Sequence, residues 1–168
     1  MAQYKLVTCT INGKKREQIV DVRASLTDML RNNYHLTSVK KGCEVGECGA
    51  CTVLLDGEAI NSCLYLAVWA DGKEIITLEG LMNPDGTLSD IQKAFIDETA
   101  IQCGFCTPGF ILTATEILNA GVEYTDDELR KLLSGHLCRC TGYENILRAV
   151  KKTMYRRLGL PMPTEPEA

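Results

Sequence analysis

The sequence predicts an α+β chain in which a small mixed sheet with one helix is followed by a four-helix bundle. In the first half, apolar residues alternate with polar ones, which is the period of a strand. In the second half they recur every three or four residues, which is the period of a helix. The turn-rich stretch Met82–Gly86 separates the two patterns. We therefore expect a first domain at 1–80, a linker at 81–86, a helical domain at 87–158 and a tail at 159–168.

The first two strands are predicted on either side of a tight turn. Residues Tyr4–Ile11 alternate in polarity, and Asn12 and Gly13 follow directly. An Asn-Gly pair favours a two-residue hairpin because a type I′ turn needs positive φ at both positions. The second strand is then expected at Lys14–Val22. Because Cys9 shares a strand face with apolar residues, we interpret it as a small buried hydrophobe.

One helix and a second hairpin complete the first domain. Ser25 can cap a short helix, since its hydroxyl can accept a hydrogen bond from the free N–H groups of the first turn. The pair Asp56 and Gly57 marks another two-residue turn. The predicted elements are a helix at Leu26–Asn32, strands at Thr52–Leu55 and Glu58–Asn61, and a last strand at Glu74–Leu78.

Four apolar stripes at helical spacing follow the linker. Pro108 suits the first turn of the second helix, and Thr125–Glu128 is a capping box that opens the third. Four short helices in succession predict a small bundle. The stripes expected to face inward are Leu88, Ile91 and Phe95; Phe110, Ala114, Ile117 and Leu118; Leu129, Leu132 and Leu133; and Tyr143, Ile146, Leu147, Val150 and Met154.

Composition limits the classes of function. The chain has 168 residues, a formal net charge of −4 with both signs spread along it, and no long apolar run. A nucleic-acid partner would favour a basic patch and a membrane span would need about 18 consecutive apolar residues, so neither is expected. The first residues lack the apolar run of a signal peptide, which predicts a cytoplasmic protein. Nine cysteines in that reducing compartment favour metal binding over disulfides.

The first cysteine set has the spacing of plant-type ferredoxins. Cys43, Cys48 and Cys51 follow the pattern C-x4-C-x2-C, and Cys63 comes after the second predicted hairpin. Such spacing is typical of a 2Fe–2S cluster with four thiolate ligands. Three ligands from one short segment require a tightly curled backbone, which glycines permit. These are Gly42, Gly46 and Gly49. We therefore expect a ferredoxin-like (β-grasp) first domain that binds one cluster.

The second cysteine set lies in the helical domain. Cys103 and Cys106 precede the helix that Pro108 opens, and Cys138 and Cys140 precede the last helix. A one-residue gap places two side chains together only where the backbone is not helical, so the second pair is expected on a turn. Two helix N-termini would then point free N–H groups at an anionic group. This pattern predicts a second 2Fe–2S site.

Structural zinc sites and disulfides are the alternatives for these cysteines. Three cysteines within the nine residues from Cys43 to Cys51 are unusual for zinc. His136 lies two residues before Cys138, but a Rieske centre needs two histidines. We interpret His136 as a helix-terminal or surface histidine, and His35 in the same way.

Three longer motifs surround the cysteines: Gly42–Cys51, Gln102–Gly109 and Leu137–Tyr143. Together they resemble the iron–sulfur subunit of the molybdenum hydroxylases, the xanthine dehydrogenase family, and the resemblance covers about residues 4–157. The stretch Ser62–Ala67 is most similar to bacterial xanthine (purine) dehydrogenase small subunits, with nicotinate and other hydroxylases of the family close behind. His136 departs from the asparagine that is commoner at this place in the family.

The resemblance implies an electron-transfer subunit that performs no substrate chemistry itself. It implies a large partner subunit with a molybdenum–pterin cofactor and a medium partner subunit with FAD. The complex is then a hetero-oligomer, for which a dimer of heterotrimers is one arrangement. In the family the helical-domain cluster lies nearest the molybdenum and the ferredoxin-like cluster faces the flavin. Positions matching Gln102 and Cys140 sit against the pterin.

Several functions remain open at this point. The leading one is electron relay in a xanthine or purine dehydrogenase, and the same role in a nicotinate, other heterocycle or aldehyde hydroxylase follows. A free-standing two-cluster ferredoxin and a structural zinc module are further alternatives. The substrate pocket would lie on another chain, so the sequence does not choose among substrates.

Overall fold

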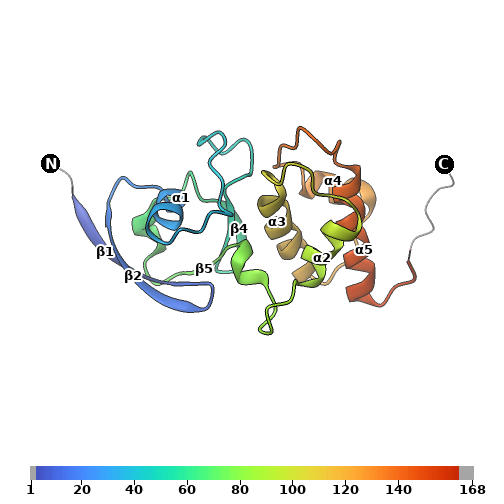
Figure 1. Cartoon of the computed structure of the whole chain (residues 1–168), viewed down its shortest axis with the longest axis horizontal. Coiled ribbons are helices and arrows are strands. Elements are labelled where there is room, and N and C mark those ends of the chain that lie inside the picture. Colours follow the sequence, from blue (N-terminus) through green and yellow to red (C-terminus); the bar gives the residue numbers. More distant parts are fainter. Residues whose placement is uncertain (1–2, 163–168) are drawn as a thin grey trace.

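The computed structural model describes residues 3–162 and shows two lobes lying side by side (Figure 1). The sheet and its short helix form one lobe, and four α-helices form the other. The N- and C-terminal ends of the described chain lie at opposite ends of the molecule. This arrangement confirms the α+β class expected from the change of hydrophobic period.

The sheet has five strands in the order β2-β1-β5-β3-β4. Strand β1 (Tyr4–Ile11) pairs antiparallel with β2 (Lys14–Asp21), and β3 (Thr52–Leu55) pairs antiparallel with β4 (Glu58–Asn61). Strand β5 (Glu74–Ile76) lies between the two hairpins, parallel to β1 and antiparallel to β3. Both predicted hairpins are confirmed, whereas β5 ends two residues earlier than expected.

Both hairpin turns have the backbone that their residues favour. Asn12 and Gly13 have φ values of 50° and 74°, and Asp56 and Gly57 have φ values of 50° and 92°. Positive φ at both central residues is the signature of the type I′ turn, whose twist matches that of the flanking strands.

A single core lies on one face of this sheet. Cys9 is 3% exposed and packs with Val7 and Ile11 against the short helix. Burial, with a smaller contribution from Asp71, raises the pKa of its thiol. The interpretation of Cys9 as a small buried hydrophobe is therefore confirmed.

The short helix of this lobe changes its winding partway along. α1 (Leu26–Asp28) continues directly into a π-helical turn at Met29–Asn33. Ser25 caps it as expected, because its hydroxyl accepts a hydrogen bond from the backbone N–H of Asp28 at 3.1 Å. The predicted helix at Leu26–Asn32 is therefore correct in place, but its hydrogen-bond pattern is only partly α-helical.

Two 3₁₀ turns were not predicted, at Ala67–Ala70 and Leu78–Leu81. Each has four residues, which is too short for a periodic pattern to appear in the sequence. Leu78 and Leu81 pack against the core of the helical lobe, so the chain enters that core before the turn-rich stretch.

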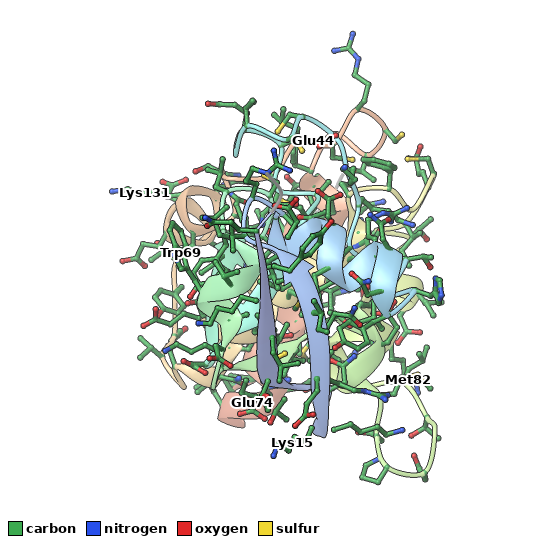
Figure 2. The ribbon with its side chains drawn as sticks, turned by 90° about the vertical axis from the view of Figure 1, so that its left-hand side faces the viewer. Lys15, Glu44, Trp69, Glu74, Met82 and Lys131 are labelled. Carbon is green, nitrogen blue, oxygen red and sulfur yellow. The ribbon has the colours of Figure 1, made fainter. Side chains whose placement is uncertain are left out.

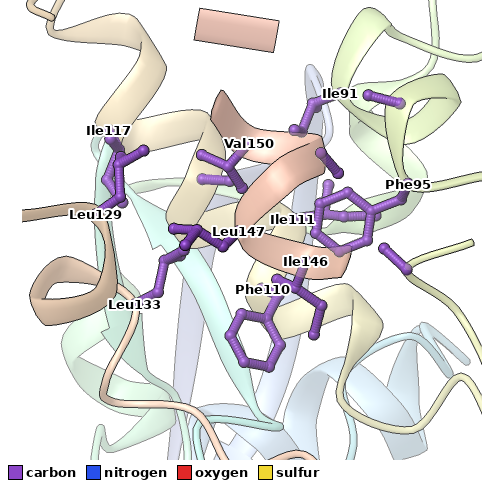
Figure 3. Close-up of a cluster of buried hydrophobic side chains, with 14 of the residues drawn as sticks. Ile91, Phe95, Phe110, Ile111, Ile117, Leu129, Leu133, Ile146, Leu147 and Val150 are labelled. Atoms are coloured by element: carbon purple, nitrogen blue, oxygen red, sulfur yellow. The ribbon is translucent and has the colours of Figure 1, made fainter. Parts of the chain in front are cut away.

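The helical lobe consists of α2 (Asp90–Asp97), α3 (Thr107–Asn119), α4 (Asp126–Leu132) and α5 (Glu144–Leu158). Their apolar side chains meet around α5, as Figure 3 shows. The predicted capping box of α4 is present, since Thr125 and Glu128 bond to each other's backbone N–H groups.

Three residues expected in this core lie outside it. Leu88 precedes α2 and Leu132 ends α4, and both are about half-exposed. Tyr143 is also half-exposed because it precedes α5 with a left-handed backbone, at φ 71°. The helical period assigns a face only inside a helix, so it does not apply to Leu88 and Tyr143. Leu132 lies in the last turn of α4 but on the face away from the core, which Leu129 and Leu133 contact.

The turn-rich stretch and the first cysteine loop lie on opposite edges of the molecule. Figure 2 places Glu44, in the loop of Cys43 and Cys48, at the top of the view, and Met82, at the start of the stretch, at the bottom. In the stretch, Asn83 donates its backbone N–H to the carbonyl oxygen of Thr87 at 2.9 Å.

Within the described residues, no helix is long and apolar enough to cross a membrane.

Candidate iron–sulfur cluster sites

The loop of the first cysteine set curls around its own thiols. Glu44, Gly46 and Gly49 have left-handed φ values of 58°, 82° and 67°. The curl turns the backbone N–H groups of Val45 and Glu47 toward the sulfur of Cys43, at 3.4 and 3.3 Å. These donors, Val45 first, lower the pKa of the Cys43 thiol to about 7. The loop therefore favours a thiolate at Cys43.

Glycine at position 42 gives the sulfur of Cys48 its space. A Cβ atom added to Gly42 would lie 2.8 Å from that sulfur, closer than real Cβ contacts. The amide of Asn61, at the end of β4, donates to the carbonyl oxygen of Gly46 at 3.0 Å. The sheet thus holds the loop in place while glycine keeps the backbone close to the thiol.

Cys51 and Cys63 close the first site from the side of the sheet. Cys51 is 3% exposed, and burial raises the pKa of its thiol to about 11. The hydroxyl of Ser62 donates to the carbonyl oxygen of Cys51 at 2.6 Å, which ties the segments of Cys51 and Cys63 together. A thiol of this kind loses its proton when it coordinates a metal.

The second cysteine set is brought together from two turns. α3 begins directly after Cys106, and Cys138 and Cys140 lie on a non-helical turn before α5, as predicted. The backbone N–H and the hydroxyl of Thr141 lie 3.5 and 3.1 Å from the sulfur of Cys138. Burial opposes ionisation there, but the hydrogen bonds from Thr141 outweigh it and lower the pKa of the Cys138 thiol.

Tyr143 stabilises this second turn. Its hydroxyl accepts a hydrogen bond from the backbone N–H of Cys138 at 3.0 Å. Tyr143, which the helical period assigned to the bundle core, therefore supports a predicted ligand instead. The only indication of this in the sequence is that Tyr143 follows Cys138 closely.

The eight thiols approach one another in pairs. Cys43 contacts Cys48, and Cys51 contacts Cys63; in the helical lobe Cys106 contacts Cys138, and Cys103 contacts Cys140. A 2Fe–2S cluster takes four cysteines, two on each iron. Among residues 3–162, no three cysteine, histidine or acidic side chains are grouped to hold a single metal ion. Two sets of paired thiols with inward N–H donors fit two 2Fe–2S clusters.

The two candidate sites are linked by a main-chain hydrogen bond. The backbone N–H of Leu137 donates to the carbonyl oxygen of Cys48 at 3.1 Å. Leu137 directly precedes Cys138, so one predicted ligand of each set lies at or beside this bond. The loops of the two lobes are therefore in direct contact.

His136 is a buried residue of the contact between the lobes, so of the two interpretations, helix-terminal or surface, the surface one is wrong. It follows the end of α4, where its N–H donates to the carbonyl oxygen of Leu133. Its side chain is 5% exposed, and its Nε2 lies 2.7 Å from the hydroxyl of Thr113 in α3. Burial lowers its pKa to about 4, so the ring is neutral at physiological pH. No residue pattern around His136 indicates this burial, because the residues that bury it come from both lobes. His35 is exposed, as expected.

Gln102 and Cys140 lie on the same side of the helical lobe. Both are exposed, and the thiol of Cys140 contacts Cys103, the residue after Gln102. The second site is thus open to a partner at this side, whereas Cys106 on the inner side is buried.

Two family models match the chain. Residues 9–76 match a 2Fe–2S iron–sulfur cluster binding domain, and residues 77–151 match a [2Fe–2S] binding domain. The fold and the two sets of paired thiols accordingly define a protein that binds two 2Fe–2S clusters.

Similar proteins narrow the family to which this two-cluster chain belongs. The nicotine 6-hydroxylase small subunit of Paenarthrobacter nicotinovorans is 53% identical over 140 residues, 83% of this chain and 84% of the relative. The xanthine dehydrogenase iron–sulfur-binding subunit of Escherichia coli O157:H7 is 52% identical over 146 residues, 86% of this chain and 91% of the relative. The chain belongs to the small 2Fe–2S subunits of the molybdenum hydroxylase family, and it is an electron-transfer subunit of such a complex.

A solved structure supports the same conclusion. Quinoline 2-oxidoreductase from Pseudomonas putida 86 contains a chain that superposes with a TM-score of 0.89 at 44% identity, covering 94% of this chain and 98% of that one. The α+β fold with a ferredoxin-like first domain and a helical second domain is therefore confirmed.

Proposed function

We propose that this chain carries electrons from a molybdenum–pterin subunit to an FAD subunit. Each 2Fe–2S cluster, when bound, accepts and releases one electron, so a two-electron substrate oxidation is passed on in two steps. The observation that carries the proposal is the hydrogen bond between Leu137 N–H and the Cys48 carbonyl oxygen, which joins the two cysteine loops. The chain's own task is to hold two redox sites next to each other and away from substrate.

The proposed ligands are the eight paired cysteines. Cys43, Cys48, Cys51 and Cys63 hold the cluster of the first lobe; Cys103, Cys106, Cys138 and Cys140 hold that of the second. Backbone N–H donors around Cys43 and Cys138 support these assignments, because they stabilise thiolate charge. Cys9 takes no part, since it lies within the apolar core of the sheet.

The electron path has an entry and an exit. We assign the entry to the second site, where Gln102 and Cys140 are exposed and would meet the pterin. The exit is the first site, where Val45 and Leu64 expose 62% and 60% of their surface beside the thiols. Exposed apolar side chains around a redox site suit contact with a flavin subunit.

The proposed substrate of the complex is xanthine or a related purine. The Escherichia coli xanthine dehydrogenase subunit supports this at 52% identity, and the caffeine dehydrogenase subunit gamma of Pseudomonas sp. (strain CBB1), at 48%, is named for another purine. The nicotine 6-hydroxylase subunit, at 53%, favours a second candidate, the hydroxylation of a pyridine ring. These candidates share an electron-poor nitrogen heterocycle, and the chain does the same work in each.

The test is to purify the complex from the cytoplasm, where we place it, and to identify its subunits. We expect two partners, one containing molybdenum–pterin and one containing FAD. Xanthine, caffeine, nicotine, nicotinate and benzaldehyde are then added anaerobically in turn, and bleaching of the iron–sulfur absorption is followed. Bleaching by xanthine first supports the proposal, bleaching by nicotine first selects the second candidate, and a chain that purifies alone contradicts the relay.

A further inference from the structure

The ring of His136 occupies a narrow space between the two lobes. Two glycines lie against its Nδ1 and Cε1 atoms: Gly49, in the loop of Cys48 and Cys51, and Gly109, in the first turn of α3. A Cβ atom on Gly49 would overlap the Nδ1 and Cε1 atoms of the ring. A Cβ atom on Gly109 would overlap the carbonyl oxygen of Gly49 and come within 3.1 Å of Nδ1. Both glycines are therefore needed for the ring to fit.

Two side chains of α3 hold the ring in one orientation. The hydroxyl of Thr113 lies 2.7 Å from Nε2, and the Phe110 ring centroid lies 4.7 Å from that of the imidazole. The ring is thus fixed to α3 by a hydrogen bond and by stacking, while its opposite edge faces Gly49 of the other lobe.

The backbone on both sides of His136 is also fixed. Its own N–H donates to the carbonyl oxygen of Leu133 at 3.3 Å, which ties it to the end of α4. The next N–H, of Leu137, donates to the carbonyl oxygen of Cys48. The residue after that is Cys138. His136 thus touches the first cysteine loop, the helix that follows Cys106 and the segment that leads into Cys138.

We propose that His136 is a positioning residue, which holds the cysteine loops of the two lobes at a fixed separation and thereby sets the coupling between the two clusters. The proposal that this spacing governs electron flow rests on the proposed relay; the placement of the loops does not. Electron transfer between two centres falls steeply with their separation, so a small movement of one loop changes the rate. His136 is suited to this because its ring fills the space between the lobes and is held to α3 by Thr113.

The test uses a pair of threonines on α3. Thr113→Val removes the hydroxyl that holds the imidazole and keeps the side-chain shape. Thr115→Val is the matched control, because its hydroxyl is buried and bonds within its own helix to the carbonyl oxygen of Ile111 at 2.7 Å. His136→Ala removes the ring, and His136→Gln keeps a polar group able to reach Thr113.

Two measurements are made on the full chain with both clusters. Hydrogen exchange followed by mass spectrometry reports the opening of peptides covering residues 40–51 and 134–143. Electron paramagnetic resonance of the fully reduced protein at low temperature reports the spin–spin interaction between the clusters. A merely structural role would lower the melting temperature without changing that interaction.

We expect Thr113→Val to speed exchange in both peptides by about threefold to tenfold, the effect of losing one hydrogen bond. It should also change the spin–spin interaction, with two clusters retained. His136→Ala should exceed this effect and His136→Gln should partly restore the parental behaviour, whereas Thr115→Val should change neither measurement. Parental exchange and parental spin–spin interaction in both Thr113→Val and His136→Ala would overturn the proposal.

Failure of the relay itself is recognised separately. If the parental chain shows two coupled clusters but its complex does not pass electrons to FAD, the relay is wrong and the positioning role stands. If His136→Ala loses a cluster, the Thr113→Val and Thr115→Val pair still decides, since neither threonine is a predicted ligand.

Discussion

Asn12 and Thr77 exchange two hydrogen bonds between segments that are 65 residues apart in the chain. The side-chain N–H of Asn12 donates to the hydroxyl of Thr77 at 3.0 Å, and the backbone N–H of Thr77 donates to the side-chain oxygen Oδ1 of Asn12 at 2.9 Å. Thr77 is fully buried. The residue that makes the first hairpin turn therefore also anchors the chain where it leaves the sheet.

This pair predicts a double-mutant cycle with Gly80. The three atoms nearest to a Cβ atom on Gly80 would all belong to the side chain of Asn12, and it would overlap the Oδ1 and Cγ atoms. Asn12→Gly keeps the turn but leaves the buried Thr77 N–H unpaired, which should lower the free energy of unfolding by about 1–3 kcal/mol. Gly80→Ala should destabilise the parent but cost much less in the Asn12→Gly protein, with a coupling of about 1 kcal/mol or more. Additive changes in chemical unfolding would show that the two side chains do not meet.

Cys9 and Cys51 predict opposite outcomes for the same substitution. Both are 3% exposed, but only Cys51 belongs to a set of paired thiols. Cys9→Ser should retain about four irons and four sulfides per chain, two of each for each cluster. It should lower stability by about 1–3 kcal/mol if its hydroxyl finds no partner. Cys51→Ser should lose one cluster. Metal analysis and the electron paramagnetic resonance signals of the two clusters test both outcomes. Loss of one signal in a folded Cys9→Ser protein would contradict the ligand assignment.

Replacement of Cys48 tests the order of the relay in the complex. Cys48→Ser should disturb the cluster of the first lobe while substrate still reduces that of the second. Flavin reduction should then slow sharply, since the proposed exit is damaged, whereas substrate binding is unchanged. Rapid-mixing spectra measure both steps. Flavin reduction at the parental rate without the first-lobe cluster would show that electrons take another route.

The ion pair of Arg157 and Asp90 predicts a defined pH dependence. The guanidinium Nε and the Asp90 carboxylate are 2.6 Å apart, and the hydrogen bonds from Arg157 lower the pKa of Asp90 below its ordinary 3.8. A carboxyl group whose pKa is lower in the folded state stabilises the fold at pH values above its unfolded pKa. This stabilisation is lost as the pH falls through the folded pKa. Because the carboxylate is nearly half-exposed, we expect Arg157→Gln to cost about 1 kcal/mol or less.

The difference between parent and Arg157→Gln should therefore stay constant from about pH 8 to pH 5 and shrink below pH 4. Unfolding midpoints across that range measure it, with Arg156→Gln on the neighbouring exposed position as control. A difference that grows as pH falls would mean that Asp90 is not the partner that matters.

Local signals in the sequence predicted the elements whose cause is local. The Asn-Gly and Asp-Gly turns, the capping box at Thr125–Glu128 and the spacing of the cysteines each act within a few residues. They placed the strands, the helix starts and the two cysteine loops close to where the structure has them.

The rest depends on contacts between distant segments. His136 is buried by Gly49 and Gly109, which come from different lobes, and no pattern near His136 reports them. Tyr143 leaves the helical stripe because its hydroxyl accepts the N–H of Cys138. The helical period marks which residues share a face within a helix, but not which residue turns away at its end to bond a loop.

The hydrogen bond between the two cysteine loops is made by main-chain atoms, and this bears on which substitutions it can survive. The side chain of Leu137 is 61% exposed, and its N–H alone reaches Cys48. Nineteen of the twenty amino acids keep that donor, and only proline lacks it. The side chain at position 137 is therefore free to vary, while the hydrogen bond between the two cysteine loops is kept by every residue except proline.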